Sequence, residues 1–108
     1  MEWINNKKNV EKLLQDYGEL RHIEIRNNGI VYSYHNSTLK RISYNDLANL
    51  CKLKASELGF GLASWVEQGE DGACELKHKN KNIEMMFKDD TEAEATFKAY
   101  EWILNNID

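Results

Sequence analysis

Three histidines and two cysteines are the side chains of this sequence best suited to nucleophilic or general-base chemistry: His22, His35, His78, Cys51 and Cys74. A catalytic thiol needs a histidine within hydrogen-bonding reach. Cys74 and His78 are four positions apart in an alternating segment, so they share a strand face about two pleats apart, too far for a direct bond. Cys51 lies on the apolar side of a predicted helix. We therefore expect both thiols to be buried and unreactive, and we predict that the protein is not an enzyme.

A metal site would need three or four converging ligands. The histidines and cysteines show neither H-x-x-x-H nor C-x-x-C spacing. Carboxylates are adjacent at Asp89 and Asp90 and again at Glu70 and Asp71, but the first pair precedes a predicted helix and the second falls in a predicted turn. No glycine-rich phosphate loop is present. We predict no metal and no cofactor.

Basic and aromatic residues indicate one possible binding chemistry, that of single-stranded nucleic acid. The stretch "KHKNK" is a predicted hairpin tip, and aromatic rings on a sheet can stack bases. The candidate phosphate contacts are Lys77, Lys79, Lys81, Arg26 and Arg41, and the candidate stacking rings are Tyr32, Tyr34 and Trp65. An acidic isoelectric point near 5.4 and an acidic second half oppose phosphate binding, so this function is the alternative.

Acidic residues and a tryptophan near the C-terminus indicate a second chemistry, docking to another protein. The final predicted helix and its approach carry Asp89, Asp90, Glu92, Glu94, Glu101 and Asp108, with Lys98 expected to pair with Glu94. Acidic residues in a first turn also favour the helix dipole without any function. Trp102 is off the apolar helix face, as an interface anchor would be, although its ring and that of Trp3 could instead pack on a neighbouring helix.

The totals describe the chain that must position these residues. Its 108 residues, 42% hydrophobic and 30% charged, predict one soluble domain over 1–108. We expect neither a leader peptide nor a membrane segment, and two cysteines without a disulfide framework favour the cytoplasm. The formal charge is +3 over 1–54 and −7 over 55–108. Such asymmetry is typical of a solvated surface, or of an acidic face that meets a basic partner.

Local patterns predict the elements of the first half. An apolar stripe predicts a helix over 2–17, ended by Gly18. Alternation predicts a strand over 20–26, and Asn28-Gly29 predicts the turn into a strand over 30–35. A weaker strand follows over 38–43. Ser43 and Asp46 have the spacing of a capping box at the start of the next helix, which ends at Gly59.

The second half repeats this order. Strands are predicted over 61–68, 73–79 and 83–88, and the closing helix is predicted to be capped by Asp89 with Glu92 three positions on. Gly29 aligns with Gly72, which makes a duplication of 20–59 and 61–107 a hypothesis beside convergent hairpin chemistry. The predicted fold is α+β in the order α-βββ-α-βββ-α, with one antiparallel sheet and helices mainly on one face. The uncovered face must then meet water or a partner.

Element order and acidity together resemble those of type III secretion chaperones, small acidic dimers that bind an effector segment. The resemblance carries over no site residues; a phage or mobile-element inhibitor is another candidate in the same class. We therefore predict a cytoplasmic protein that binds another protein, and a homodimer would cover an open sheet face. The contact residues would be Trp102, Glu94 and Glu101 on the helix and Tyr32, Tyr34 and Trp65 on the sheet.

Overall fold

The computed structural model describes residues 2–35, 37–69 and 71–107, so Glu70 of the predicted turn and Asp108 of the acidic group lie outside the described residues. Four α-helices, one 3₁₀ helix and six strands follow in the predicted α-βββ-α-βββ-α order. They are α1 (Glu2–Asn5), α2 (Lys7–Leu14), the 3₁₀ helix (Gln15–Tyr17), β1 (Leu20–Arg26), β2 (Gly29–Tyr34), β3 (Lys40–Ser43), α3 (Tyr44–Glu57), β4 (Phe60–Val66), β5 (Gly72–His78), β6 (Glu84–Asp89) and α4 (Glu92–Asn106). The chain forms two compact units, 1–47 and 48–108.

The strands form two separate three-stranded antiparallel sheets, β1-β2-β3 and β4-β5-β6, in the described part of the chain. The α+β class is confirmed, but the expectation of one continuous sheet is wrong. The strands of each three-stranded meander pair with one another, and the 14-residue helix α3 connects β3 of the first to β4 of the second. No helix among the described residues has the length and apolar content that a membrane span requires.

The N-terminal helix is broken where the sequence predicts one continuous helix. Asn6 is non-helical, and its side chain accepts a hydrogen bond from the backbone nitrogen of Lys8 at 3.2 Å, which makes it the N-cap of α2. The apolar stripe survives the break, because Ile4, Val10 and Leu14 are all buried. Trp3 is buried too, contrary to the partial exposure considered for it.

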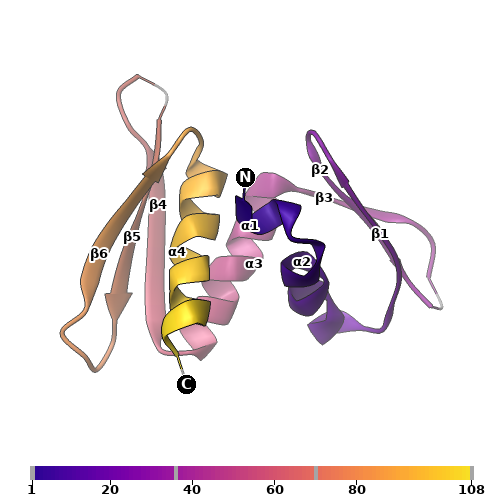
Figure 1. Ribbon diagram of the computed structural model, residues 1–108, viewed down its shortest axis with the longest axis horizontal. Helices are drawn as coiled ribbons and strands as arrows, with labels where there is room; N and C mark the ends of the chain where they lie inside the picture. The colour runs from indigo at the N-terminus through magenta and orange to yellow at the C-terminus, as the bar shows by residue number, and fades with distance from the viewer. Residues whose placement is uncertain (1, 36, 70, 108) are drawn as a thin grey trace. The chain divides into compact units, whose positions relative to one another are not determined.

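In the first unit, helix α2 packs toward β1 and covers one face of its sheet (Figure 1). Ile23, Ile30 and Tyr34 have the strand parity of this face, and the Tyr34 hydroxyl donates to the carbonyl oxygen of Leu14 at 2.8 Å. The opposite face carries Arg26 and other polar side chains. One face of this sheet is therefore packed against α2, and the other presents charged and polar side chains.

In the second unit, helix α4 packs along β4, β5 and β6 on one face of their sheet (Figure 1). Cys74 and Leu76 of β5 are fully buried on this side, as are Phe97 and Ile103 of α4. Thr91, rather than the predicted Asp89, is the N-cap: its Oγ1 accepts from the backbone nitrogen of Glu94 at 3.1 Å. The cap predicted for α3 is confirmed, since Ser43 Oγ accepts from the nitrogen of Asp46 at 3.1 Å.

Gly29 and Gly72 occupy equivalent positions, each opening the central strand of its meander. A Cβ on Gly29 would clash with the carbonyl oxygen of Ile42, and one on Gly72 would clash with the backbone of Thr91. Because it lacks a Cβ, each glycine lets its strand pass close to the backbone just before the next helix, α3 for Gly29 and α4 for Gly72. Gly29 is the first residue of β2 rather than a turn residue, because it already pairs with Arg26. The duplication remains a hypothesis, with these shared roles in its favour.

Candidate functional site

The outer face of the β4-β5-β6 sheet, opposite α4, is the first candidate surface. Strand register places three cross-strand rows on this face: Trp65, Ala73 and Lys88; Ala63, Glu75 and Met86; and Gly61, Lys77 and Glu84. Met86 is 51% exposed and Trp65 is half-buried, whereas Ala73 is fully buried. The small Ala73 side chain leaves room for the indole ring and the lysine stem that flank it. The two large apolar side chains of this face, Trp65 and Met86, therefore lie on its two outer strands, and Glu75 occupies the middle of the central strand.

Charged residues lie between and around these apolar side chains and pair with one another. Lys77 Nζ lies 3.2 Å from Glu75 Oε1 and 3.8 Å from Glu84 Oε1. Lys88 Nζ lies 3.2 Å from Glu67 Oε2, beside Trp65. The neighbouring carboxylates raise the pKa of Lys77, with the Glu75 hydrogen bond as the largest cause. The face therefore combines large apolar side chains with neutralised charges, a composition that also occurs at protein–protein contacts.

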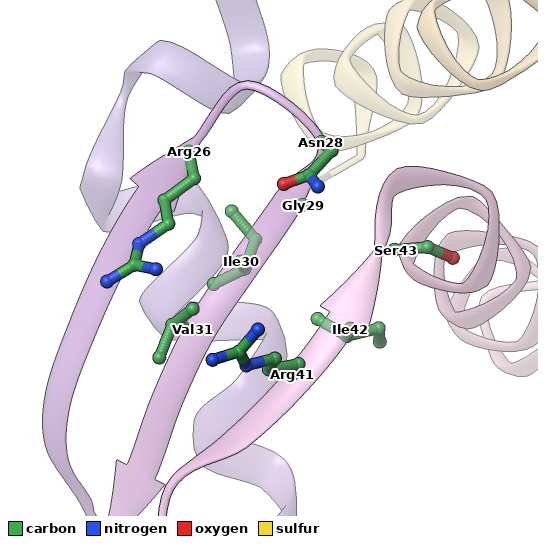
Figure 2. Close-up of a pocket in the computed structure, with 8 residues that line it drawn as sticks. All are labelled: Arg26, Asn28, Gly29, Ile30, Val31, Arg41, Ile42 and Ser43. Carbon is green, nitrogen blue, oxygen red and sulfur yellow. The ribbon is translucent and has the colours of Figure 1, made fainter.

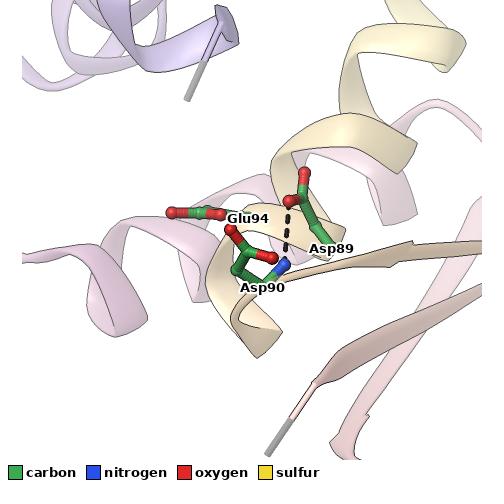
Figure 3. Close-up of side chains that lie close together, drawn as sticks. All are labelled: Asp89, Asp90 and Glu94. Atoms are coloured by element: carbon green, nitrogen blue, oxygen red, sulfur yellow. Dashed lines mark hydrogen bonds between the residues drawn. The ribbon is translucent and has the colours of Figure 1, made fainter.

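Carboxylates gather at the start of α4, the second candidate surface (Figure 3). One oxygen from each of Asp89, Asp90 and Glu94 lies within 4.8 Å of the others. Asp89 Oδ1 accepts from the backbone nitrogen of Asp90 at 2.8 Å, and Lys98 Nζ lies 3.8 Å from Asp89 Oδ2. Lys98 thus reaches Asp89 rather than the predicted Glu94. Burial, and then the Asp89 carboxylate, raise the pKa of Glu94.

The acidic residues of α4 and its tryptophan lie in different surroundings. At 100° per residue, Glu94 and Glu101 fall on one narrow stripe of the helix with exposed Lys98. Trp102 falls outside that stripe and meets Phe60 edge to face, with ring centroids 6.4 Å apart. Its half-buried ring therefore packs within the second unit. Trp65, on the far side of the β4-β5-β6 sheet, is separated from all three of these predicted contact residues.

Two arginines meet in a pocket on the sheet of the first unit, the third candidate surface (Figure 2). The pocket has a volume of about 300 Å³ and is lined by Arg26, Asn28, Gly29, Ile30, Val31, Arg41, Ile42 and Ser43. Arg26 Nη2 lies 3.2 Å from Glu24 Oε2, which also lies 3.0 Å from His22 Nε2. The His22 hydrogen bond and Arg26 lower the pKa of Glu24. Arg41 is exposed and has no ion pair in the described part of the chain.

The two tyrosines predicted to lie on an open sheet face are on the α2 side of the first sheet. Tyr34 bonds to the Leu14 carbonyl, and its ring meets that of Tyr32 edge to face at 5.6 Å. Burial raises the pKa of both phenols. The physical reason is strand parity, because Tyr32 and Tyr34 share a face with buried Ile30. Their rings are consequently half-buried beneath other side chains rather than free stacking platforms.

The five predicted phosphate contacts divide between the two units. Arg26 and Arg41 come together in the first, while Lys77, Lys79 and Lys81 belong to the second. Lys77 is engaged by two carboxylates of its own sheet, and Lys79 and Lys81 are exposed beyond β5. Sequence reasoning selected both arginines but missed their shared pocket. The sequence shows only that Arg26 and Arg41 flank one predicted strand; their shared face follows from the registers that pair Arg26 with Gly29 and Arg41 with Val31.

The histidines and cysteines are not assembled into a common site by any contact in the described part of the chain. His22 lies beside Glu24, and His35 Nε2 lies 3.7 Å from Glu19 Oε1. The His78 ring packs on Phe60 with centroids 4.7 Å apart, and its Nδ1 accepts from the Asn80 nitrogen at 3.0 Å. Both thiols are free and buried, and burial raises the pKa of each. Neutral buried thiols are poor nucleophiles.

Comparisons with protein-family models, with curated proteins and with solved structures find no match to this chain.

Proposed function

We propose that this protein is a non-catalytic protein-binding module whose contact surface is the outer face of the β4-β5-β6 sheet. The observation that carries the proposal is the presence of two large apolar side chains, Trp65 of β4 and Met86 of β6, on the sheet face that α4 does not cover. Large apolar side chains removed from water stabilise a complex by about 25 cal/mol per Å² of surface buried. Tryptophan is also among the residues that most often dominate binding energy at interfaces.

The charges on this face suit a second copy of the same chain as partner. Lys77 and Lys88 lie on the same face as Glu67 and Glu84. A two-fold axis parallel to the face apposes the faces of two copies, and because the face carries both signs of charge, positive side chains of one copy can lie opposite negative ones of the other. Such a dimer would cover Trp65 and Met86 without requiring a partner of opposite net charge.

Self-association is the first measurement, by light scattering after size exclusion across a wide range of protein concentration. Wild type should pass from monomer to dimer, and Trp65→Ser should remain a monomer. Leu53→Ser is the matched control, because Leu53 is 60% exposed on α3 and the change likewise removes an exposed apolar side chain, on a helix rather than on the sheet face. The control should associate like wild type. Equal association of Trp65→Ser and wild type would contradict the proposed surface.

A monomeric wild type would exclude the homodimer and leave a different protein as partner. In that case, immobilised wild type and Trp65→Ser should capture different sets of proteins, with a specific species lost from the variant and retained by Leu53→Ser. Identical captures by all three proteins would overturn the proposal. Circular dichroism of each variant separates loss of binding from loss of folding.

The cytoplasm is the compartment that we propose. Its support is the pair of free cysteines, Cys51 and Cys74, both buried without a disulfide in the described residues. A reducing environment keeps such thiols in that state. Cell fractionation with a tagged chain checks the location, and recovery from an oxidising compartment would contradict it.

A further inference from the structure

The pocket between Arg26 and Arg41 contains positive charge without acidic lining residues. Arg26 ends β1, Arg41 belongs to β3, and Val31 of the central strand pairs directly with Arg41. Figure 2 shows the Arg41 side chain of β3 reaching toward Val31, whereas the Arg26 side chain extends along β1. The other lining residues are uncharged. The two arginines therefore border an apolar floor at Val31, which is only 5% exposed and which has Arg41 and Glu24 as its cross-strand neighbours.

Both guanidinium groups keep donors available for a ligand. Arg26 contacts Glu24 through Nη2, and a guanidinium group has five N–H donors in total. Arg41 has no carboxylate within ion-pair distance among the described residues. Glu24 therefore holds Arg26 in place while Arg41 remains uncompensated. An arginine in this state attracts an anion from solution.

We propose that this pocket binds the phosphate group of a small ligand, either inorganic phosphate or a phosphomonoester. Each guanidinium group can donate two parallel hydrogen bonds to phosphate oxygens, and arginines from two strands can bind different oxygens of one tetrahedral group. A volume of about 300 Å³ accommodates a phosphate with a small organic substituent. The site lies in the first unit and does not depend on the outer face of the β4-β5-β6 sheet.

The experiment is a calorimetric titration of the full chain with inorganic phosphate, with adenosine monophosphate and with a single-stranded oligonucleotide, at constant ionic strength set by chloride. Binding should be saturable, and Arg41→Gln should weaken it by about tenfold or more, because a hydrogen bond to a charged group contributes about 1.5–3 kcal/mol. Arg26→Gln should weaken it similarly. Arg41→Lys keeps the charge but loses the bidentate geometry, so its affinity should fall between wild type and Arg41→Gln.

Lys40→Gln is the matched control. Lys40 is exposed and adjacent to Arg41 on β3, but it has the opposite strand parity and does not line the pocket. Lys40→Gln removes one positive charge, as Arg41→Gln does. If local hydrogen bonds rather than the long-range electrostatic field bind the ligand, the affinity of Lys40→Gln should stay within about twofold of wild type. Tighter binding of adenosine monophosphate than of inorganic phosphate would identify the phosphomonoester as the ligand class, and the reverse would identify free phosphate.

Three results would overturn the proposal. The first is the absence of saturable binding by either small phosphate. The second is an equal loss of affinity in Lys40→Gln and Arg41→Gln while both variants keep the wild-type circular dichroism spectrum. The third is binding confined to the oligonucleotide, with affinity that rises with strand length, which would assign the arginines to a nucleic-acid surface instead.

Discussion

Replacing Gly72 by alanine should destabilise the second unit by overpacking the junction between β5 and α4. A Cβ at this position would clash with the carbonyl carbon and oxygen of Thr91 and with the nitrogen of Glu92. These are backbone atoms, so a side-chain rotation cannot relieve the clash. Thr91 is held in place by the hydrogen bonds that its hydroxyl and carbonyl oxygens accept from the nitrogens of Glu94 and Ala95, at 3.1 and 3.0 Å.

The expected loss of unfolding free energy is large because the atoms that the new Cβ displaces belong to the backbone. Overpacking a well-packed site costs about 1–3 kcal/mol, and we expect Gly72→Ala to lie near the upper end because α4 must move as a whole. A loss of about 2–3 kcal/mol lowers the melting temperature of a domain of this size by about 10 °C. The denaturant midpoint should fall with little change in the slope of the transition.

Gly61→Ala on the adjacent strand is the matched control. Its Cβ would meet no atom closer than the Lys77 carbonyl oxygen at 4.0 Å. Because alanine restricts the unfolded chain, this variant should be neutral or more stable by about 0.5 kcal/mol. Urea unfolding of both variants, followed by circular dichroism at 222 nm, measures the difference. Equal midpoints for Gly72→Ala and wild type would refute the close approach of Thr91 to β5.

Two further predictions concern the α4 cap and the buried thiols, in addition to those made for Trp65 and Arg41. Thr91→Ala should lower the free energy of unfolding by about 1 kcal/mol, because the N-cap hydrogen bond from the Glu94 nitrogen is lost. Thr91→Ser keeps the hydroxyl and should stay near wild type in the same urea titration. If Asp89 were the cap instead, Thr91→Ala would be neutral. Burial raises the pKa of the Cys51 thiol in the folded protein, so the stability that it contributes is complete below the ordinary thiol pKa of about 8.5 and is lost as pH rises above it. Cys51→Ala should therefore flatten the alkaline decline of unfolding free energy, and an unchanged pH profile would count against burial of this thiol.

Patterns within short segments predicted the elements well. Alternation, turn signals and β-rich composition together predicted the six strands, and Ser43 predicted the start of α3, because each signal depends only on neighbouring residues. Errors arose where two local signals competed. Asn6 interrupts an apolar stripe that continues across it, and Thr91 takes the capping role for which Asp89 was also suited. Backbone geometry selects between such alternatives, and residue type alone does not.

Predicting the candidate sites was harder, because they depend on which face of each strand is covered. Trp65, Tyr32 and Tyr34 are alike as aromatic strand residues. Trp65, however, lies on the sheet face away from α4, whereas Tyr34 packs against α2. Met86 entered no prediction, because its exposure depends on the side from which α4 packs. The pocket of Arg26 and Arg41 likewise requires the register of three strands.

The sequence by itself determined the order of elements, the helix cap at Ser43 and the residue types available for binding. These follow from periodicity, caps and turns, which act over a few residues. Only the tertiary structure decided that the strands divide into two sheets, which face of each sheet is covered, and which charges pair. Those outcomes depend on contacts between residues far apart in the chain, and a helix can satisfy the same local pattern on either side of a sheet.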